Sequence, residues 1–570
     1  MSTTPRGFAA LAGVTAAVVA IGVAEPVAVL TGPRSAPLIA VGGVVVDVVP
    51  EPLKQFAIDV FGTYDKIALL VGTAVLLAAF AAGIGALAAR RLSVGLVGIA
   101  AFAGLGAAAA LTRAGADAAD ALPALVGGGL GALVLWAFVA GPWQLDPWPW
   151  RPPTPLPAAP SAPTPEPSPS PKSGSSSVEP SLKAGTTGPP PTPPPPTPGS
   201  PVVPPAGWEP LEPTDPESRR RFLRGAGLLA GAATVVGLGG HWLAGRRGVS
   251  AAREAVALPT PSAVAPAVPP GADLSLAQLA PYTTPNSGFY RIDTALVVPQ
   301  VDPATWRLRI HGRVRNPIEL TFAELLARPM VERYVTLACV SNEVGGDLIG
   351  NARWLGVPIR ELLDEAEPEE GADQVVGRSV DGWTCGTPTA ALRDGRDALL
   401  AVGMNGEPLP VEHGFPVRMV VPGLYGYVSA CKWVTELELT SFADFDAYWV
   451  PRGWSAQGPV KTQSRIDTPR PRNRLTAGEV VVAGVAWAQH RGISRVEVRV
   501  DGGGWQEATL APAVSVDTWV QWSWRWPATA GEHTLQVRAT DRDGETQTPL
   551  AAPVAPDGAT GWHSVTVTVR

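Results

Sequence analysis

Four apolar stretches follow one another in the first 141 residues, and they constrain the fold more than any other feature of the chain. The stretches are Gly7–Leu30, Ile67–Ala88, Leu92–Leu111 and Leu122–Val139. Each is close to the roughly 20 residues that an α-helix needs to cross a bilayer. The first also resembles a signal peptide, but no small-residue cleavage site follows it. The sequence therefore predicts a four-helix transmembrane bundle over residues 1–141.

The positive charges beside these stretches predict their orientation. Arg6 precedes the first stretch, and Arg90 and Arg91 lie between the second and the third. The positive-inside rule places these arginines in the cytoplasm and the loops Thr31–Lys66 and Thr112–Ala121 outside. The first loop also fits an interfacial helix around Leu53–Phe61. The four stretches contain no histidine, so they do not suggest a membrane haem, and we interpret them as an anchor.

A Pro-rich segment and a second apolar stretch follow. Residues 142–217 are dominated by Pro, Ser and Thr, and we expect a disordered cytoplasmic linker. The run Ser218–Arg224 (SRRRFLR) resembles a twin-arginine export signal, and the apolar stretch Ala226–Ala244 comes after it. Residues 218–247 are thus predicted to form a signal and a fifth transmembrane helix, followed by a tether over 248–282. The alternative is an ordinary cytoplasmic positive flank.

Charge and cysteine content exclude several kinds of site. The net charge is −6, so no strongly basic body suggests binding to nucleic acid. The cysteines are Cys339, Cys385 and Cys431, and no CxxC motif or Cys/His cluster occurs. Ligand sets for zinc, iron–sulfur clusters and c-type haem are therefore missing from the sequence.

Residues 283–445 have the pattern of an α+β domain. Trp306–Val314 alternates apolar and polar residues as a half-buried strand does, and Thr321 begins a capping box for a short helix. The apolar run Tyr334–Ala338 ends at Cys339, and glycine-rich sequence follows. This pattern presents Cys339 on a loop at the end of a strand, although a buried structural thiol would fit the same pattern.

Five sequence blocks carry a resemblance to a known family. They are Phe289–Asp293, Thr336–Asn342, Ala352–Pro358, Met404–Gly423 and Gly426–Trp433. In this order they resemble the molybdopterin domain of the sulfite oxidase family, and with the C-terminal part the likeness covers about half of the chain. The resemblance implies a Mo-molybdopterin cofactor and oxygen-atom transfer.

The resemblance also implies roles for individual residues. Cys339 matches the thiolate that binds molybdenum, and Cys339, Arg291 and Trp383 are expected to be catalytic. The expected cofactor-binding residues are Tyr290, Arg291, Asp293, Asn342, Thr384, His413, Arg418, Ala430 and Lys432. Backbone amides near Ala430–Lys432, together with the Lys432 ammonium, are expected to hold the cofactor phosphate.

Departures from the family pattern leave two substrate classes open. Glu343 and Val344 stand where sulfite-oxidising members carry arginines, and Val485 stands at another arginine position. Trp383 replaces an expected tyrosine. Because a doubly charged anion needs several cationic donors, an organic S- or N-oxide is as compatible with the sequence as sulfite.

Residues 465–570 carry several strand-like runs with turn signals, which predicts an immunoglobulin-like β-sandwich. The resemblance implies a dimerisation-type domain there, and a homodimer through it is possible. The whole chain then predicts a multi-pass cell-membrane oxidoreductase with an extracytoplasmic catalytic domain, an external cytochrome or quinone-linked electron partner and export by the twin-arginine machinery. The alternative is a non-enzymatic surface protein that uses its immunoglobulin-like module for adhesion.

Overall fold

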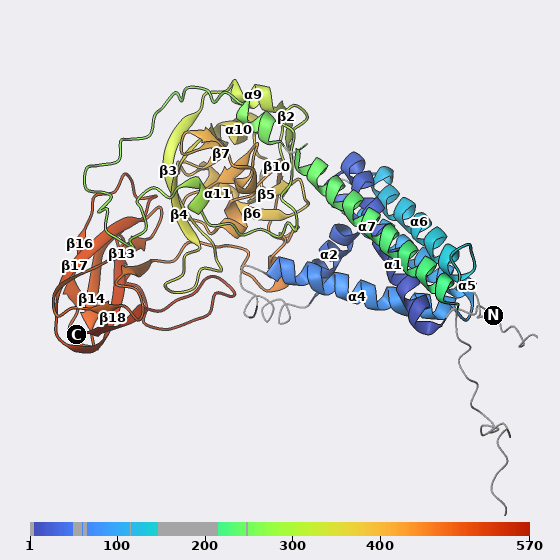
Figure 1. Cartoon of the computed structure of the whole chain (residues 1–570). Coiled ribbons are helices and arrows are strands. Elements are labelled where there is room, and N and C mark those ends of the chain that lie inside the picture. Colours follow the sequence, from blue (N-terminus) through green and yellow to red (C-terminus); the bar gives the residue numbers. More distant parts are fainter. Residues whose placement is uncertain (1–4, 50–59, 61–64, 114–115, 146–214, 247–248) are drawn as a thin grey trace, which may run out of the picture.

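The computed structural model describes residues 5–49, 60, 65–113, 116–145, 215–246 and 249–570. Figure 1 shows a helical bundle, a central α+β part and a β-sandwich at the C-terminal end. Most of the Pro-rich linker and, apart from Val60, the expected interfacial helix around Leu53–Phe61 lie outside the described residues.

The bundle is built from apolar helices that pack closely. Its described elements are α1 (Arg6–Thr31), η1 (Pro33–Ser35), α2 (Pro37–Val48), α4 (Asp65–Ala88), α5 (Leu92–Leu111), η3 (Ala118–Ala121), α6 (Leu122–Val139) and α7 (Pro216–Arg246). Helix α1 packs against α4, α6 and α7. At Gly13 and Gly22 the backbones approach so closely that a Cβ atom would overlap a carbonyl of the facing helix. Small residues thus permit the contact, as in many helix pairs in membranes.

The predicted apolar stretches are confirmed as helices. Among the described residues, five helices are long and apolar enough to cross a membrane. Helix α7 begins before the predicted stretch Ala226–Ala244 and includes the arginine run Arg219–Arg224. Helix α2 was not predicted, and it starts with proline at its first turn, a residue that suits a helix start.

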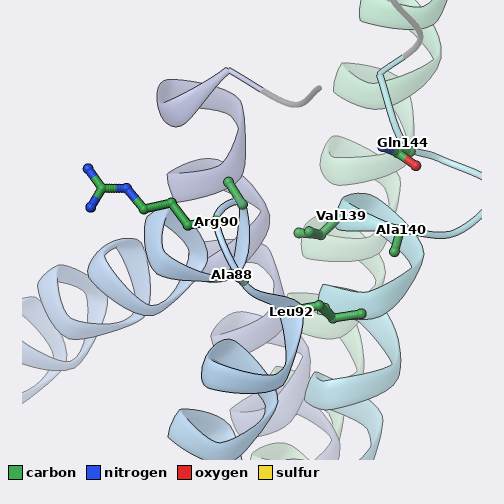
Figure 2. Close-up of a pocket in the computed structure, with 7 residues that line it drawn as sticks. Ala88, Arg90, Leu92, Val139, Ala140 and Gln144 are labelled. Atoms are coloured by element: carbon green, nitrogen blue, oxygen red, sulfur yellow. The ribbon is translucent and has the colours of Figure 1, made fainter. Parts of the chain in front are cut away.

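Two cavities lie within the bundle. One of about 550 Å³ is lined by apolar residues of α1, α2, α4, α5 and α6. The other, of about 340 Å³, lies where the turn between α4 and α5 meets the end of α6. Figure 2 shows that the Arg90 side chain points away from this second cavity. The lining residues of both cavities come from the bundle alone.

The central part contains two sheets. One has the strand order β2-β1-β10-β5-β6, and the other has the order β3-β4-β7-β8 with β9 beside β7. The strands of the first are β1 (Arg307–Gly312), β2 (Ile318–Thr321), β5 (Gln374–Ser379), β6 (Thr384–Pro388) and β10 (Val434–Thr440). Those of the second are β3 (Val331–Ala338), β4 (Ile349–Pro358), β7 (Leu399–Met404), β8 (Glu407–Pro408) and β9 (Arg418–Val420).

Short helices precede, connect or follow these strands. They are α8 (Ser250–Glu254), η4 (Asn286–Gly288), α9 (Phe322–Leu326), α10 (Ile359–Ala366), α11 (Thr389–Arg393), η5 (Val411–His413), α12 (Gly426–Ser429) and η6 (Val450–Arg452). The predicted capping box is confirmed, because Thr321 and Glu324 exchange both of its hydrogen bonds at the start of α9. The predicted strand before Cys339 is confirmed as the end of β3.

The C-terminal part is a sandwich of two sheets, with the orders β11-β13-β17-β16 and β12-β19-β18-β14-β15. Its strands are β11 (Gln463–Thr468), β12 (Arg474–Leu475), β13 (Gly478–Trp487), β14 (Ile493–Val500), β15 (Gln506–Glu507), β16 (Thr509–Leu510), β17 (Val520–Ala528), β18 (Gly531–Asp541) and β19 (His563–Val569). Val482, Trp522 and Leu535 are buried between the sheets. The strand-like runs and turn signals predicted a sandwich, and the structure confirms it.

The central part contacts the bundle and the sandwich in different ways. Val485, Trp487 and Trp519 of the sandwich belong to the same buried cluster as the core of the central part. On the bundle side, Arg34 donates a hydrogen bond of 2.5 Å to the Val380 carbonyl. Just beyond α7, the Val249 N–H bonds Gln300 Oε1 at 3.2 Å.

Candidate active site

Cys339 lies where β3 ends and a tight loop begins. Its N–H donates to the Leu348 carbonyl at 2.9 Å, and its carbonyl accepts from the Asn342 N–H at 3.1 Å. Asn342 Oδ1 in turn accepts from the Leu348 N–H at 2.8 Å. These bonds close the loop on itself, and Cys339 is only 8% exposed.

The surroundings of Cys339 disfavour a free thiolate. Burial raises the pKa of its thiol, while hydrogen bonds from Ser341 and the charge of Lys432 lower it by less. Desolvation favours the neutral form of a thiol, whereas a bound metal cation deprotonates it. The site therefore suits a thiolate that binds a metal better than a free nucleophile.

Aromatic residues form one wall beside the thiol. Burial raises the pKa of the Tyr290 hydroxyl, the charge of Cys339 raises it further, and the charge of Arg418 lowers it. Phe289 stacks on Tyr290 with ring centroids 5.2 Å apart and meets the Trp354 ring edge-on at 5.7 Å. Tyr290 is therefore fixed next to both Cys339 and Arg418.

His413 and Arg418 form a buried pair between η5 and β9. Arg418 Nη1 donates to the His413 carbonyl at 3.1 Å, and the guanidinium lies 5.0 Å from the centre of the Trp354 ring. His413 Nε2 lies 3.1 Å from the Asn286 carbonyl, which only accepts, so Nε2 carries the hydrogen. Burial and the charge of Arg418 lower the pKa of His413 to about 4, so the imidazole is neutral at physiological pH.

A chain of charges runs along the other side of the site. Lys432 Nζ lies 2.6 Å from an Asp293 oxygen, and Arg291 Nε lies 2.8 Å from the same atom. The Lys432 ammonium also lies 4.7 Å from the centre of the Trp433 ring. Burial lowers the pKa of Lys432 to about 8, and Asp293 opposes that effect.

The cluster carries more positive than negative charge. Arg291 and Lys432 pair with Asp293, the charge of Arg418 acts on Lys432, and the exposed Glu412 carboxylate acts on His413. Buried cations need anionic partners to offset their desolvation. The surplus fits an anionic phosphate group, and the buried Cys339 thiol fits a soft sulfur ligand of molybdenum. The residues present thus match the expected cofactor.

Some predicted site residues make other contacts. Thr384 Oγ1 accepts from the Tyr448 N–H at 2.9 Å, and neighbouring Trp383 packs partly buried against the central core. In the part of the chain that the structure describes, neither Trp383 nor Thr384 forms a hydrogen bond, ion pair or ring contact with Cys339. Their expected roles stay predictions.

Two of the three backbone amides expected near the cofactor phosphate already have hydrogen-bond acceptors. The Ala430 N–H donates to the Gly426 carbonyl at 2.9 Å, so this amide is not a free donor. The Cys431 N–H is in hydrogen-bond contact with the Cys385 thiol. Of these three amides, only the Lys432 N–H has no hydrogen-bond acceptor among the described residues, and it is the candidate donor.

Sequence reasoning missed two residues of the β-sandwich that reach the loop after Cys339. Arg465 Nη1 donates to the Gly346 carbonyl at 2.6 Å. The His563 ring packs so closely on Gly345 that a Cβ atom there would overlap it. No local pattern marks either residue, because each reaches this loop only through the packing of the sandwich on the central part.

Comparison with known proteins matches both C-terminal parts. The family model of the oxidoreductase molybdopterin binding domain matches residues 295–449, and that of a bacterial Ig domain matches residues 463–537. Sulfite oxidase from Gallus gallus is 31% identical over 336 residues, which cover 50% of this chain and 72% of that protein.

Mitochondrial sulfite oxidase from Rattus norvegicus is 31% identical over 341 residues, and the match covers 62% of its length. Among solved structures, the sulfane dehydrogenase SoxCD from Paracoccus pantotrophus matches with 25% identity and a TM-score of 0.46, over 51% of this chain and 82% of that one.

Proposed function

Because this chain belongs to the sulfite oxidase family of molybdenum-dependent oxidoreductases, whose cofactor is Mo-molybdopterin, we propose that it is a membrane-anchored enzyme that transfers oxygen atoms outside the cytoplasm. The observation that carries the proposal is the buried cluster in which the Cys339 thiol lies near a surplus of cationic side chains. When bound, the cofactor supplies a metal that exchanges an oxygen atom and electrons with the substrate.

The residues of the chain hold and orient that group. Cys339 would be the thiolate ligand, and hydrogen bonds within the loop after it hold its backbone. Arg418 and Lys432 would offer charge and hydrogen bonds to the anionic groups of the cofactor, and neutral His413 would offer Nδ1 as a hydrogen-bond acceptor. Tyr290 stacks on Phe289 and interacts electrostatically with Cys339.

The charges at the site favour a weakly charged substrate. Arg291 is the most exposed cation of the cluster, with 36% of its side chain accessible, and Asp293 already pairs with it. Glu343, exposed on the loop after Cys339, adds negative charge near the site. A dianion such as sulfite gains little attraction here, so we propose an organic S- or N-oxide as the preferred substrate.

The bundle supports a membrane location. Arg90 and Arg91 lie at the turn between α4 and α5, and Arg219–Arg224 lie in the first turns of α7, whose other end leads to the catalytic domain. Figure 1 places those first turns at the end of the bundle away from that domain. With positive charges inside, the catalytic domain lies outside. An external electron carrier completes the reaction, since the chain offers no haem or iron–sulfur ligand set in its sequence.

The test is metal analysis followed by turnover. Protein purified from a host that makes the cofactor should contain stoichiometric molybdenum and pterin, and with a redox dye it should turn over S-oxides faster than sulfite. Cys339→Ser should remove turnover and leave the melting temperature close to that of the parent protein. Protein without molybdenum would instead support a surface-binding role.

A separate test concerns export. Replacing Arg219 and Arg220 with lysine keeps the charge but removes the twin-arginine pair. The catalytic domain of this variant should stay in the cytoplasm and be protected from protease added outside. Normal exposure of the domain would refute the twin-arginine route.

A further inference from the structure

The loop after Cys339 is held from outside its own domain by Arg465 on β11. The Arg465 side chain is 9% exposed, and its Nε lies 2.6 Å from an Asp467 oxygen. Its Nη1 donates to the Gly346 carbonyl at 2.6 Å. Asp467 offsets the buried charge, so the other arm of the planar guanidinium is directed at the loop.

His563, at the start of β19, braces the same loop. Its Nδ1 accepts from the Ile466 N–H at 3.0 Å, so in the neutral ring Nε2 carries the hydrogen. Burial and the charge of Arg465 lower the pKa of His563 to about 4. The neutral ring packs against Gly345, whose φ of +82° few other residues adopt.

The strand that leads to Cys339 is held by the sandwich as well. Thr336 Oγ1 accepts from the Trp519 N–H at 2.8 Å, and the Thr336 carbonyl accepts from Gln489 Nε2 at 3.0 Å. The Thr336 N–H donates to the Asp517 carbonyl at 2.9 Å. The backbone on both sides of Cys339 is therefore bonded to the β-sandwich.

We propose that Arg465, supported by His563, is a positioning residue of the active site, which sets the conformation of the loop Cys339–Gly346 and through it the direction of the Cys339 side chain. The β-sandwich is then a component of the catalytic centre. The effect on turnover rests on the proposed function, whereas the effect on loop conformation does not.

Lysine cannot replace Arg465 in this role. One ammonium group at the end of a flexible chain cannot reproduce the guanidinium fork that bonds Asp467 and Gly346 at once. Arg465→Lys therefore keeps the charge and loses the bridge, and Arg465→Ala loses both. Groups that orient a metal ligand indirectly typically change affinity or activity by about 10- to 100-fold when they are removed.

The control is Arg525→Ala. Arg525 belongs to β17 of the same sandwich and forms an ion pair with Glu479, but its side chain is 75% exposed. This variant should match the parent protein in every measurement below.

Hydrogen exchange of the purified full-length protein tests the loop directly. Amides in the segment 340–348 should exchange at least about tenfold faster in Arg465→Ala and Arg465→Lys than in the parent protein, because the segment loses its hydrogen bond to Arg465. The exchange rate in His563→Gln should lie between that of the parent protein and those of the Arg465 variants. Exchange in β18, within the same sandwich, should not change. Unchanged exchange of 340–348 in Arg465→Ala would overturn the proposal, whatever the enzyme does.

Turnover and spectroscopy test the catalytic consequence. In an Arg465→Lys variant that keeps stoichiometric molybdenum, kcat should fall about tenfold, and KM should stay within about twofold of the parent value. The electron paramagnetic resonance signal of the half-reduced metal should also change. A purely structural contact would lower the melting temperature and leave that signal intact. An unchanged signal and kcat in a variant with faster loop exchange would refute the positioning role. A parent protein that binds no molybdenum would refute the proposed function alone.

Discussion

The catalytic domain is attached to the rest of the chain on two sides, and the two attachments differ in kind. On the sandwich side, Trp487 and Trp519 are part of the continuous apolar core, and buried hydrogen bonds reach the strand of Cys339. On the bundle side, the described contacts include one hydrogen bond from Arg34 to the Val380 carbonyl and the packing of Gly42 beside Leu296.

The difference shows that sequence order is a poor guide to function here. The sandwich follows the catalytic domain in the chain, yet its side chains Arg465 and His563 contact the loop after Cys339. The bundle occupies the first part of the chain, yet the contacts described above are the Arg34 hydrogen bond to a backbone carbonyl and Gly42 beside the Leu296 side chain. These contacts indicate that residues 249–570 form one folding unit, to which the proposed anchor is attached.

Removing each attachment should have opposite results. A chain that ends before β11 exposes the faces that Trp487 and Trp519 cover, so we expect it to be insoluble or degraded. A chain that starts at Val249 keeps that interface and should be soluble, with molybdenum bound. Size-exclusion chromatography and metal analysis of the two proteins check this. A chain without the sandwich that is soluble and binds molybdenum would show that the catalytic domain does not depend on the sandwich.

The Trp519→Ala variant tests the interface between the sandwich and the catalytic domain with a single substitution. Trp519 is 1% exposed, and its indole N–H donates to the Tyr282 carbonyl at 2.8 Å. Loss of such a side chain from a core typically lowers the free energy of unfolding by about 3–5 kcal/mol. Denaturant unfolding should show this loss in the signals of both domains together. Trp505→Ala, at a partly exposed site of the same sandwich, should cost less.

Acidification should destabilise the same unit. Unfolded histidine takes up a proton near its ordinary pKa of 6.5, but folded His413 does so only near 4. Stability is therefore complete above pH 6.5 and is lost as the pH falls toward 4, by at most about 3 kcal/mol for this group. The pKa of His563 is lowered in the same way, so this residue adds to the loss of stability at low pH. Melting curves of His413→Gln and His563→Gln should depend less on pH than those of the parent protein, and equally steep curves would contradict the assignment.

The smallest effect is expected at the bundle contact. Arg34→Ala removes a partly exposed hydrogen bond to a carbonyl, which is worth about 1 kcal/mol or less. Turnover in lipid nanodiscs should stay within about twofold of the parent protein. A tenfold loss would show that the bundle shapes the active site after all, and the two attachments would then be equivalent.

Local patterns in the sequence predicted the elements that depend on local physics. The apolar stretches, the capping box at Thr321 and the strand that ends at Cys339 each follow from periodicity or from neighbouring residues. The resemblance to the sulfite oxidase family implied that His413 and Arg418 bind the cofactor, and the structure shows these two residues in contact.

The remaining features depend on packing between distant segments. Arg465 and Gly346 are 119 residues apart, and only the docking of two domains joins them. The occupied Ala430 amide depends on how α12 ends, which no residue pattern shows. Helix α2 was missed because its apolar run was assigned to a loop between spans.

One consequence follows from the short junction after α7. Two residues separate the end of this helix at Arg246 from Val249, whose N–H is already bonded to the catalytic domain, and Arg253 on α8 donates to the Leu409 carbonyl at 2.7 Å. In the proposed topology, the long Pro-rich segment lies on the opposite side of the bilayer and adds nothing to the reach of the enzyme. In that topology the catalytic domain stays close to the bilayer, so its electron carrier has to reach it at the membrane surface.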